Sequence, residues 1–271
     1  MNRNKSQRLE QFKDNCLYLG LKQLADKYQE KIDTANNDKT MGYYEFLQDI
    51  IQEEAAVKKQ RHIEYLVKNS KLPEPLKILG DFDFDFQPDL DRRLIMDLAS
   101  LQFLKARQSI LLTSKNNGVG KSHIARSLAL LACQNGYKTY YTTCSQLITD
   151  LNQGVFEKTL DKRMKKYTKP ELLVVDEMGQ DRLELQVVKE AHLLFKVIDY
   201  RYNNNQSIIF TTNVEEADWA EFLGDPITTS AIIDRLYHNS IIIKIKGESY
   251  RRFQSDELQK QYSGSENKTP E

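Results

Sequence analysis

The chain is poor in cysteine, carries no net charge and lacks long apolar runs. Its 271 residues include three cysteines, Cys16, Cys133 and Cys144, and 39 basic residues balance 39 acidic ones. So few, widely spaced cysteines exclude a disulfide framework and a cysteine zinc motif, and they favour a reducing compartment. Zero net charge excludes a globally basic nucleic-acid binder and an acidic disordered chain.

No uncharged apolar segment approaches the ~18 residues of a membrane helix. The polar start from Met1 to Arg8 shows no apolar core of a secretory signal. We therefore expect a cytoplasmic protein without membrane contact. A composition of 40% hydrophobic and 29% charged residues is typical of globular chains, here of one large or two smaller domains.

The chain changes character near residue 72. Before it, helical spacing runs from Leu17 to Tyr28 and from about Tyr43 to Lys68, with a break at Asn36-Asn37-Asp38. Prolines in Leu72-Pro73-Glu74-Pro75 end the helical pattern. The sequence predicts a helical N-terminal domain over 1–72, a second domain over 73–253, and a polar tail over 254–271 that frays.

Strand-like segments alternate with helical patterns after residue 78. Strands are expected at 109–113, 138–143, 172–176, 207–212 and 240–245, and helices near 121–134, 145–167 and 184–202. Runs such as Leu172–Val175 and Ile208–Phe210 are apolar throughout, which is typical of parallel strands covered on both faces. The alternation predicts an α/β domain, a parallel sheet flanked by helices.

The segment Lys115–Ser122 reads Lys-Asn-Asn-Gly-Val-Gly-Lys-Ser between a predicted strand and a predicted helix. A phosphate-binding loop has G-x-x-x-x-G-K-[ST] in this context. Its glycines let backbone N–H groups surround a phosphate, and the helix N-terminus adds positive charge. We expect Lys121 to contact the β- and γ-phosphates of ATP and Ser122 to ligate Mg²⁺. The expected nucleotide-binding residues here are Asn117, Gly118, Val119, Gly120, Lys121, Ser122 and His123.

Lys115 stands where the motif has its first glycine. The lysine either alters the turn or faces solvent and leaves the loop intact. One alternative is therefore a chance turn of similar sequence, and another is a nucleotide-binding module that no longer hydrolyses ATP.

Two further strands are followed by polar residues. Asp176 and Glu177 end the run from Leu172, and Asn213 follows Thr211-Thr212. Ligands of open α/β sheets bind at the carboxyl ends of the strands. We expect Asp176 to hold Mg²⁺, directly or through water, and Glu177 to orient and polarise the attacking water. We expect Asn213 to position that water or contact the γ-phosphate. The alternatives are an acidic strand cap and an ordinary turn residue.

These strand ends indicate a P-loop NTPase, whose transition state needs a cationic partner. Arg235, in the segment Ala231–Leu236, is the best candidate for an arginine finger that acts on a neighbouring subunit's nucleotide. The alternative for Arg235 is an ion pair with Asp234. Arg251 and Arg252 are candidates for sensing phosphate within the same subunit.

Three segments, 211–226, 230–238 and 247–251, closely resemble the IstB-like ATP-binding proteins. These are AAA+ ATPase helpers of an insertion-sequence transposase, related to helicase loaders of the DnaC and DnaI type. The resemblance covers roughly residues 43–252. It implies a five-stranded AAA+ sheet in the order 5-1-4-3-2, a small helical N-terminal domain, and ATP at subunit interfaces of a ring, spiral or filament. It also implies that the protein binds and bends duplex DNA and has an IstA-like transposase as its partner.

The same match assigns roles to individual residues. Walker roles fall on Lys121, Ser122, Asp176 and Glu177, the sensor position on Asn213, the trans-acting finger on Arg235, and the second sensor on Arg251.

A neutral chain needs a local basic stripe to hold DNA. The best stripe consists of Lys158, Lys162, Arg163, Lys165, Lys166 and Lys169, in a region where the family resemblance places a helical insertion that faces the pore. Contacts to phosphates alone predict sequence-tolerant, salt-sensitive binding. The alternative is a solvated helix face, and a second candidate is the cluster Lys58, Lys59 and Arg61.

The sequence thus predicts a Mg²⁺-dependent ATPase, stimulated by DNA or its partner. The resemblance implies that it assembles on duplex DNA, remodels it for target selection and helps a transposase. The alternative is a replicative helicase loader, which would prefer single-stranded DNA and bind a hexameric helicase.

Overall fold

The computed structural model describes residues 2–38, 40–179 and 187–263. The chain divides into two units, Met1–Tyr65 and Leu66–Glu271. The sequence predicts a domain boundary after residue 72, where prolines end the helical pattern. The structure instead divides within helix α3 (Tyr43–Asn69), whose last residues belong to the second unit.

The first unit contains α1 (Asn2–Tyr18), α2 (Lys22–Asn37) and the greater part of α3. The helical run expected from Leu17 to Tyr28 is interrupted, because Gly20 adopts a positive φ of 78° between α1 and α2. The expected break after Asn36 is present, and α3 covers the second expected run. Lys31 on α2 bonds both Asp49 and Glu53 on α3 at 2.6 Å, which links the two helices.

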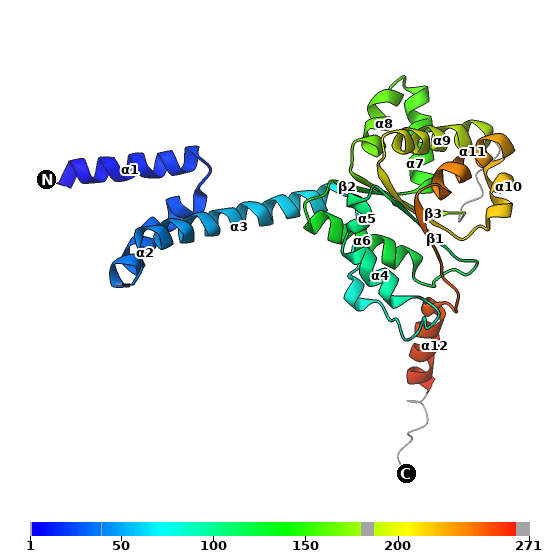
Figure 1. The fold of residues 1–271 in the computed structure, drawn as a ribbon, viewed down its shortest axis with the longest axis horizontal. Helices are drawn as coiled ribbons and strands as arrows, with labels where there is room; N and C mark the ends of the chain where they lie inside the picture. The colour runs from blue at the N-terminus through cyan, green and yellow to red at the C-terminus, as the bar shows by residue number, and fades with distance from the viewer. Residues whose placement is uncertain (1, 39, 180–186, 264–271) are drawn as a thin grey trace, which may run out of the picture. The chain divides into compact units, whose positions relative to one another are not determined.

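The second unit is built on a five-stranded parallel sheet (Figure 1). Its strands are β1 (Ser109–Thr113), β2 (Thr139–Thr143), β3 (Leu172–Met178), β4 (Ser207–Thr212) and β5 (Ser240–Lys244). Their order is β2-β3-β4-β1-β5, which is the expected 5-1-4-3-2 read from the opposite edge. The expected fold class is confirmed, and strand positions differ from the prediction by at most two residues.

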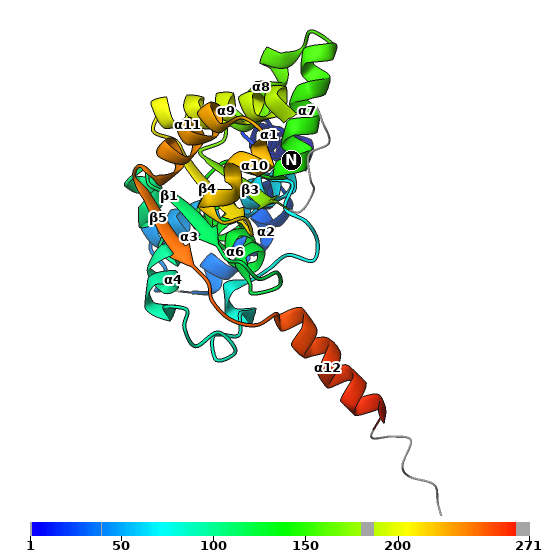
Figure 2. The same ribbon diagram turned by 90° about the vertical axis from the view of Figure 1, so that its right-hand side faces the viewer.

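Both faces of the sheet are covered by helices, as the apolar strands predict (Figures 1 and 2). Ile110 and Leu112 of β1 face a core that includes Ile124 and Leu128 of α6. Leu111 faces the opposite core, formed with α7, α9 and α11. The short elements and helices of this unit are η1 (Leu79–Asp81), α4 (Arg92–Ala99), α5 (Gln102–Lys105), α6 (Lys121–Gln134), α7 (Cys144–Phe156), α8 (Leu160–Thr168), α9 (Val187–Asn203), η2 (Glu216–Asp218), α10 (Trp219–Leu223), α11 (Pro226–Tyr237) and α12 (Tyr250–Ser263).

Three helical predictions need comment. The single helix expected over 145–167 is two helices, α7 and α8, because the chain turns at Lys158 with a φ of 57°. The helix expected near 184–202 is α9, and residues 184–186 lie outside the described residues. The tail expected to fray from residue 254 is helical to Ser263, and residues 264–271 lie outside the described residues.

Arg201 fastens α9 to the sheet. Its guanidinium is fully buried and donates to the carbonyl oxygens of Tyr167, Pro170, Glu171 and Ser207 over 2.7–3.1 Å. Burial lowers the pKa of Arg201 from its ordinary value. The four carbonyls accept from the two terminal nitrogens of the guanidinium, so one side chain joins α8, α9, β4 and the segment that leads into β3.

Within the described ranges, none of the helices combines the length and the apolar composition that a membrane span requires.

Candidate functional site

The site forms at the carboxyl ends of the central strands. β1 leads through the loop 114–120 into α6, while β3 ends in Asp176, Glu177 and Met178, and β4 ends before Asn213. Because β1, β3 and β4 are parallel, these three ends meet at one edge of the sheet. A cavity of about 330 Å³ lies there and is lined by the loop, Lys121, Glu177, Asn213 and Arg251.

Two glycines shape the loop. Gly118 and Gly120 have φ angles of 79° and 105°, and Gly120 caps the N-terminus of α6. A Cβ on Gly118 would lie 2.2 Å from Ser249 Oγ, and one on Gly120 would lie 2.4 Å from Cε2 of Phe82. Both the backbone conformation and the close neighbours therefore require glycine. The helix N-terminus at the cavity is a ready site for phosphate.

Lys115 does not disturb this loop. It is not among the described residues with positive φ, so its position does not require a glycine. Its side chain is 74% exposed, and Nζ contacts Glu215 Oε1 at 2.9 Å. Of the two possibilities left by the sequence, the structure shows the lysine directed to solvent.

Lys121 lies at the start of α6 beside the cavity. Its Nζ donates to the carbonyl oxygen of Asn116 at 3.0 Å. Burial lowers the pKa of Lys121 to about 8, Asp176 opposes this shift, and Arg251 adds to it. The ammonium is thus short of compensating negative charge, which a phosphate would supply.

Asp176 is fully buried at the centre of a hydrogen-bond network. Its Oδ1 accepts from Ser122 Oγ at 2.9 Å, from Thr211 Oγ1 and from the N–H of Glu177 at 3.1 Å. Its Oδ2 accepts from the hydroxyl of Tyr141 at 2.6 Å. Burial and the neighbouring carboxylate raise the pKa of Tyr141 above its ordinary value, so its hydroxyl remains a donor. The network holds Asp176 directly beneath Ser122.

A β-bulge aims Glu177 at the cavity. Neighbouring residues of a regular strand point to opposite faces, and that rule would direct Glu177 away from Asp176. The pairing of β3 with β4 shifts register between Val175 and Met178, and Glu177 has a φ of 62°. Bulges of this kind redirect side chains next to active sites. The N–H of Glu177 donates to Thr211 Oγ1 at 3.0 Å, which fixes the bulge.

Asn213 reaches the loop from the next strand. Its Nδ2 donates to Oδ1 of Asn117 at 3.1 Å. Its own Oδ1 is buried without a hydrogen-bond partner among the described residues. A Cβ on Gly179 would lie 2.5 Å from this oxygen. The structure therefore brings Asn213 and Asn117 together at the cavity.

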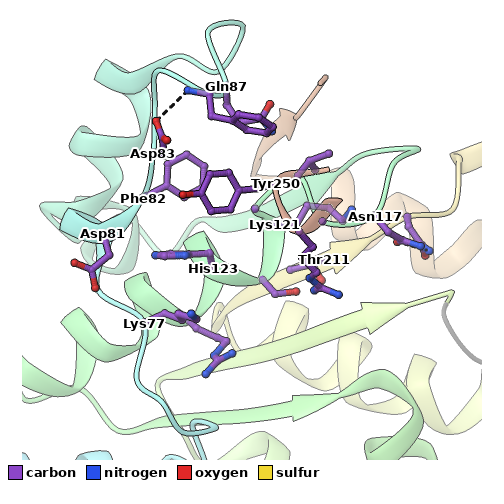
Figure 3. Close-up of a pocket in the computed structure, with 18 of the residues that line it drawn as sticks. Lys77, Asp81, Phe82, Asp83, Gln87, Asn117, Lys121, His123, Thr211 and Tyr250 are labelled. Carbon is purple, nitrogen blue, oxygen red and sulfur yellow. Dashed lines mark hydrogen bonds between the residues drawn. The ribbon is translucent and has the colours of Figure 1, made fainter. Parts of the chain in front are cut away.

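The opposite wall of the cavity is aromatic. Phe82, Phe86 and Tyr250 line it, and the rings of Phe86 and Tyr250 are 5.0 Å apart. Figure 3 shows Phe82, Tyr250 and Lys121 among the side chains that line the cavity. His123 also lines the cavity; its ring packs on Phe82, and Nε2 donates to the carbonyl oxygen of Ile78 at 2.8 Å.

The segment before α12 is attached to the phosphate loop. The N–H of Tyr250 donates to the carbonyl oxygen of Gly118 at 3.1 Å, and Nδ2 of Asn116 donates to that of Gly247 at 2.8 Å. These bonds bring Arg251 to the cavity that Lys121 lines, which is the place expected for a phosphate sensor.

Arg235 lies elsewhere. It lines a second cavity with Ser109 and Asn239, at the start of the strands rather than at their ends. Its Nε donates to Asp199 Oδ1 at 2.7 Å, and its guanidinium lies 4.8 Å from the ring centre of Phe195. The ion pair partner is therefore Asp199 and not Asp234. The strands have five or six residues and rise about 3.3 Å per residue, so the amino and carboxyl ends of the sheet are roughly 15–20 Å apart. Arg235 therefore cannot contact nucleotide in its own chain.

The basic stripe divides into two groups. Arg163 bonds Asp150 and Glu157, and Lys166 bonds Asp150 at 2.9 Å, so both are engaged within the α7–α8 hairpin. The remaining members are exposed and form no ion pair within the described part of the chain. They are Lys158, Lys162, Lys165 and Lys169.

Sequence reasoning gave no role to Tyr141, Thr211, Phe82 or Phe86. Thr211 carries the same signal that marked Asn213, a polar residue at the end of an apolar strand. Tyr141 lies in β2, and no residue near it in the sequence indicates that its hydroxyl bonds Asp176. The phenylalanines reach the cavity only through the tertiary fold.

The IstB-like ATP binding protein family model matches residues 15–258. The ATP-binding protein of insertion sequence IS5376 from Geobacillus stearothermophilus is 37% identical over 242 residues, covering 89% of this chain and 94% of that protein. That of IS21 from Pseudomonas aeruginosa is 36% identical over 213 residues, covering 79% and 78%.

Among solved structures, DnaI matches with a TM-score of 0.54 at 18% identity, covering 65% of this chain and 95% of DnaI. DnaA from Aquifex aeolicus bound to AMPPCP matches with a TM-score of 0.51 at 14% identity, covering 70% and 56%. These two similarities concern the fold alone. With its phosphate loop, strand-end carboxylates and sheet order, the chain belongs to the family of IstB-like ATP-binding proteins.

Proposed function

We propose that this protein is a Mg²⁺-dependent AAA+ ATPase that assembles on duplex DNA, remodels it and helps a transposase choose its target. The observation that carries the proposal is the placement of Arg235 at the edge of the sheet opposite the nucleotide cavity. A site with every other part of the hydrolytic machinery, but with its candidate finger out of reach, is complete only when copies assemble.

Within the cavity each side chain has a defined task. Lys121 and the N–H groups of the loop would bind the phosphates, and the aromatic wall of Phe82, Phe86 and Tyr250 would hold the base. Glu177 would accept a proton from the attacking water, which Asn213 would position. The transition state would then be stabilised by charge, since this chemistry depends on positioning and electrostatics.

Ser122 and Asp176 suit Mg²⁺. A hydroxyl and a carboxylate lie 2.9 Å apart beneath the loop, and both are the hard oxygen ligands that this ion prefers. No cluster of three or more His, Cys, Asp or Glu residues in the described ranges forms a metal site of its own. An ion bound by few protein ligands and by phosphate oxygens fits this pattern and would neutralise the charge of the triphosphate.

Mixing two inactive variants tests the shared site. Lys121→Ala loses phosphate binding but keeps Arg235, and Arg235→Ala keeps the loop but loses the finger. Each variant alone should hydrolyse ATP at least ~10³-fold more slowly than the unchanged protein, as finger removal does in related chemistry. Mixed together, they should regain a measurable fraction, because a Lys121→Ala copy supplies Arg235 to its neighbour.

Arg93→Ala is the matched control, because Arg93 is exposed on α4, does not line the cavity and should not alter turnover. An unchanged rate of ATP hydrolysis for Arg235→Ala, or no recovery on mixing, would show that the site is not shared between copies.

The preferred nucleic acid distinguishes the proposed function from the helicase-loader alternative. A transposition helper should bind duplex DNA more tightly than a single strand of equal length in the presence of ATP, whereas a loader should show the reverse. Affinities compared at one fixed salt concentration decide this, since phosphate contacts depend steeply on salt.

A further inference from the structure

Three side chains of α9 hold the guanidinium of Arg235, which belongs to α11. The two helices pack against each other on one face of the sheet (Figures 1 and 2). Phe195, Asp199 and Tyr202 are spaced at i, i+4 and i+7, so they share one face of α9. That face is turned toward α11, because all three side chains contact the same arginine. These three residues therefore form a bracket around one cation, the α9 bracket.

Asp199 sets the direction of the guanidinium. Its Oδ1 accepts from Nε of Arg235 at 2.7 Å, and its Oδ2 accepts from Nδ2 of Asn203 at 3.1 Å. Because each oxygen has its own donor, the carboxylate is held in one orientation. The guanidinium is planar and its donors are fixed relative to one another, so a bond to Nε also fixes how the other nitrogens point.

Two aromatic rings complete the α9 bracket. The ring centres of Phe195 and Tyr202 lie 4.8 Å and 5.7 Å from Cζ of Arg235. The ring of Tyr202 in turn packs edge-on against His238, with ring centres 5.4 Å apart. Cation–π attraction favours a guanidinium at such distances from a ring. The side chain of Arg235 nevertheless remains 25% exposed, so the cation is held in place and is still accessible to a neighbouring molecule.

These contacts leave one nitrogen of Arg235 available. Nε is taken by Asp199, and Nη1 donates to the carbonyl oxygen of Ala231 at 3.0 Å. Nη2 forms no hydrogen bond with any residue that the structure describes. The second cavity, which Arg235 and Arg107 line, has no aspartate or glutamate among its described lining residues. An available guanidinium nitrogen beside a cavity without acidic groups suits a phosphate anion.

We propose that Asp199 is a positioning residue of the shared ATPase site, which orients Arg235 so that Nη2 contacts the transferring phosphate held by a neighbouring copy. This rests on the proposed function, from which it takes the shared site, and it adds the residue that makes Arg235 effective. Asp199 acts only through Arg235 and does not contact the nucleotide itself. Donors oriented before the reaction need no reorganisation in the transition state, and a misplacement of about 1 Å can cost roughly 10²-fold in rate.

The experiment places Asp199→Ala in only one of two full-length proteins that are then mixed. In the parent mixture, the donor copy carries Lys121→Ala and supplies Arg235, and the acceptor copy carries Arg235→Ala and binds ATP. Asp199→Ala added to the donor copy should lower the recovered rate of ATP hydrolysis by about 10–10²-fold. The same change added to the acceptor copy should leave the recovered rate unchanged, because that copy has no arginine at position 235 to orient.

Further variants of the donor copy separate positioning from folding. With Asp199→Ala in the donor, kcat should fall while KM for ATP stays within about twofold, because the arginine acts in the transition state. Asp199→Asn keeps an oxygen that accepts from Nε and should retain most of the recovered rate. Asp234→Ala is the matched control and should retain all of it. Asp234 precedes Arg235 on α11, is exposed, and forms no ion pair in the described part of the chain.

The outcomes distinguish this role from the proposed function. No recovery in the parent mixture would overturn the proposed function, and the role of Asp199 with it. Recovery in the parent mixture that persists undiminished with Asp199→Ala in the donor copy would overturn only the role of Asp199. Equal losses with Asp199→Ala in the donor or in the acceptor would show that this residue supports the fold alone, and would overturn its role as well.

Discussion

Ser122 Oγ donates to Oδ1 of Asp176 at 2.9 Å, so the hydroxyl at the start of α6 and the carboxylate at the end of β3 are joined across 54 residues of sequence. The same carboxylate accepts from Thr211 and Tyr141. A buried carboxylate surrounded by donors is held in one orientation.

The hydroxyl of Tyr141 is a structural member of this network. We expect Tyr141→Phe to lower the free energy of unfolding by about 1.5–3 kcal/mol, the range for a hydrogen bond to a charged group. Urea unfolding with a constant slope measures the change. Tyr140→Phe is the control on the same strand, because the described residues give its hydroxyl no hydrogen bond. Equal losses for both variants would show that the bond to Asp176 contributes nothing specific.

Nucleotide affinity should depend on pH through Lys121. Burial lowers the pKa of Lys121 to about 8, so the charged form dominates below pH 8 and is lost as pH rises above it. Bound phosphates favour the charged form, and nucleotide binding at pH 8 should therefore take up about half a proton.

Calorimetry in buffers of different ionisation enthalpy measures this uptake directly. The affinity for the nucleotide should decline between pH 8 and pH 10, where the phosphates no longer titrate. Binding without proton uptake at pH 8 would contradict the assigned environment of Lys121.

Regular features of this fold are visible in the sequence, and its irregular ones are not. The apolar runs of β3 and β4 and the pattern Gly118-Val119-Gly120-Lys121 are local, so they predict the sheet and the loop. The bulge at Glu177 depends on the register between two strands that are distant in sequence. No local pattern specifies such a register shift.

The basic stripe shows the same limit. Arg163 and Lys166 have the spacing of a solvated helix face, yet both bond Asp150 on the neighbouring helix. The turn at Lys158, which makes that neighbour possible, occupies a conformation that the sequence would predict only for glycine. Which cations remain available to DNA is therefore decided by the tertiary fold.

Replacement of Arg201 should be costly. Arg201→Met keeps most of the apolar stem but leaves the four carbonyls that it serves without a donor. A buried hydrogen-bonding group that loses its partner costs about 1–3 kcal/mol, and we expect a loss of at least that size. Arg201→Lys should recover little, since a single ammonium lacks the planar fork of donors. Arg93→Met, on the exposed side of α4, is the control. Thermal melting measures the stability of the three variants, and equal melting temperatures would contradict the role of Arg201.

Glu177→Gln separates binding from hydrolysis. The amide keeps the size of the side chain but cannot accept a proton, so turnover should fall by about 10²–10⁴-fold, the usual contribution of a general base. Nucleotide affinity should change little, because Lys121 and the loop are intact. With DNA present, the variant should accumulate as an ATP-bound assembly that sediments faster than the unchanged protein. Glu215→Gln is the control, since Glu215 bonds exposed Lys115 outside the cavity. Normal turnover by Glu177→Gln would show that the bulge directs a different group at the water.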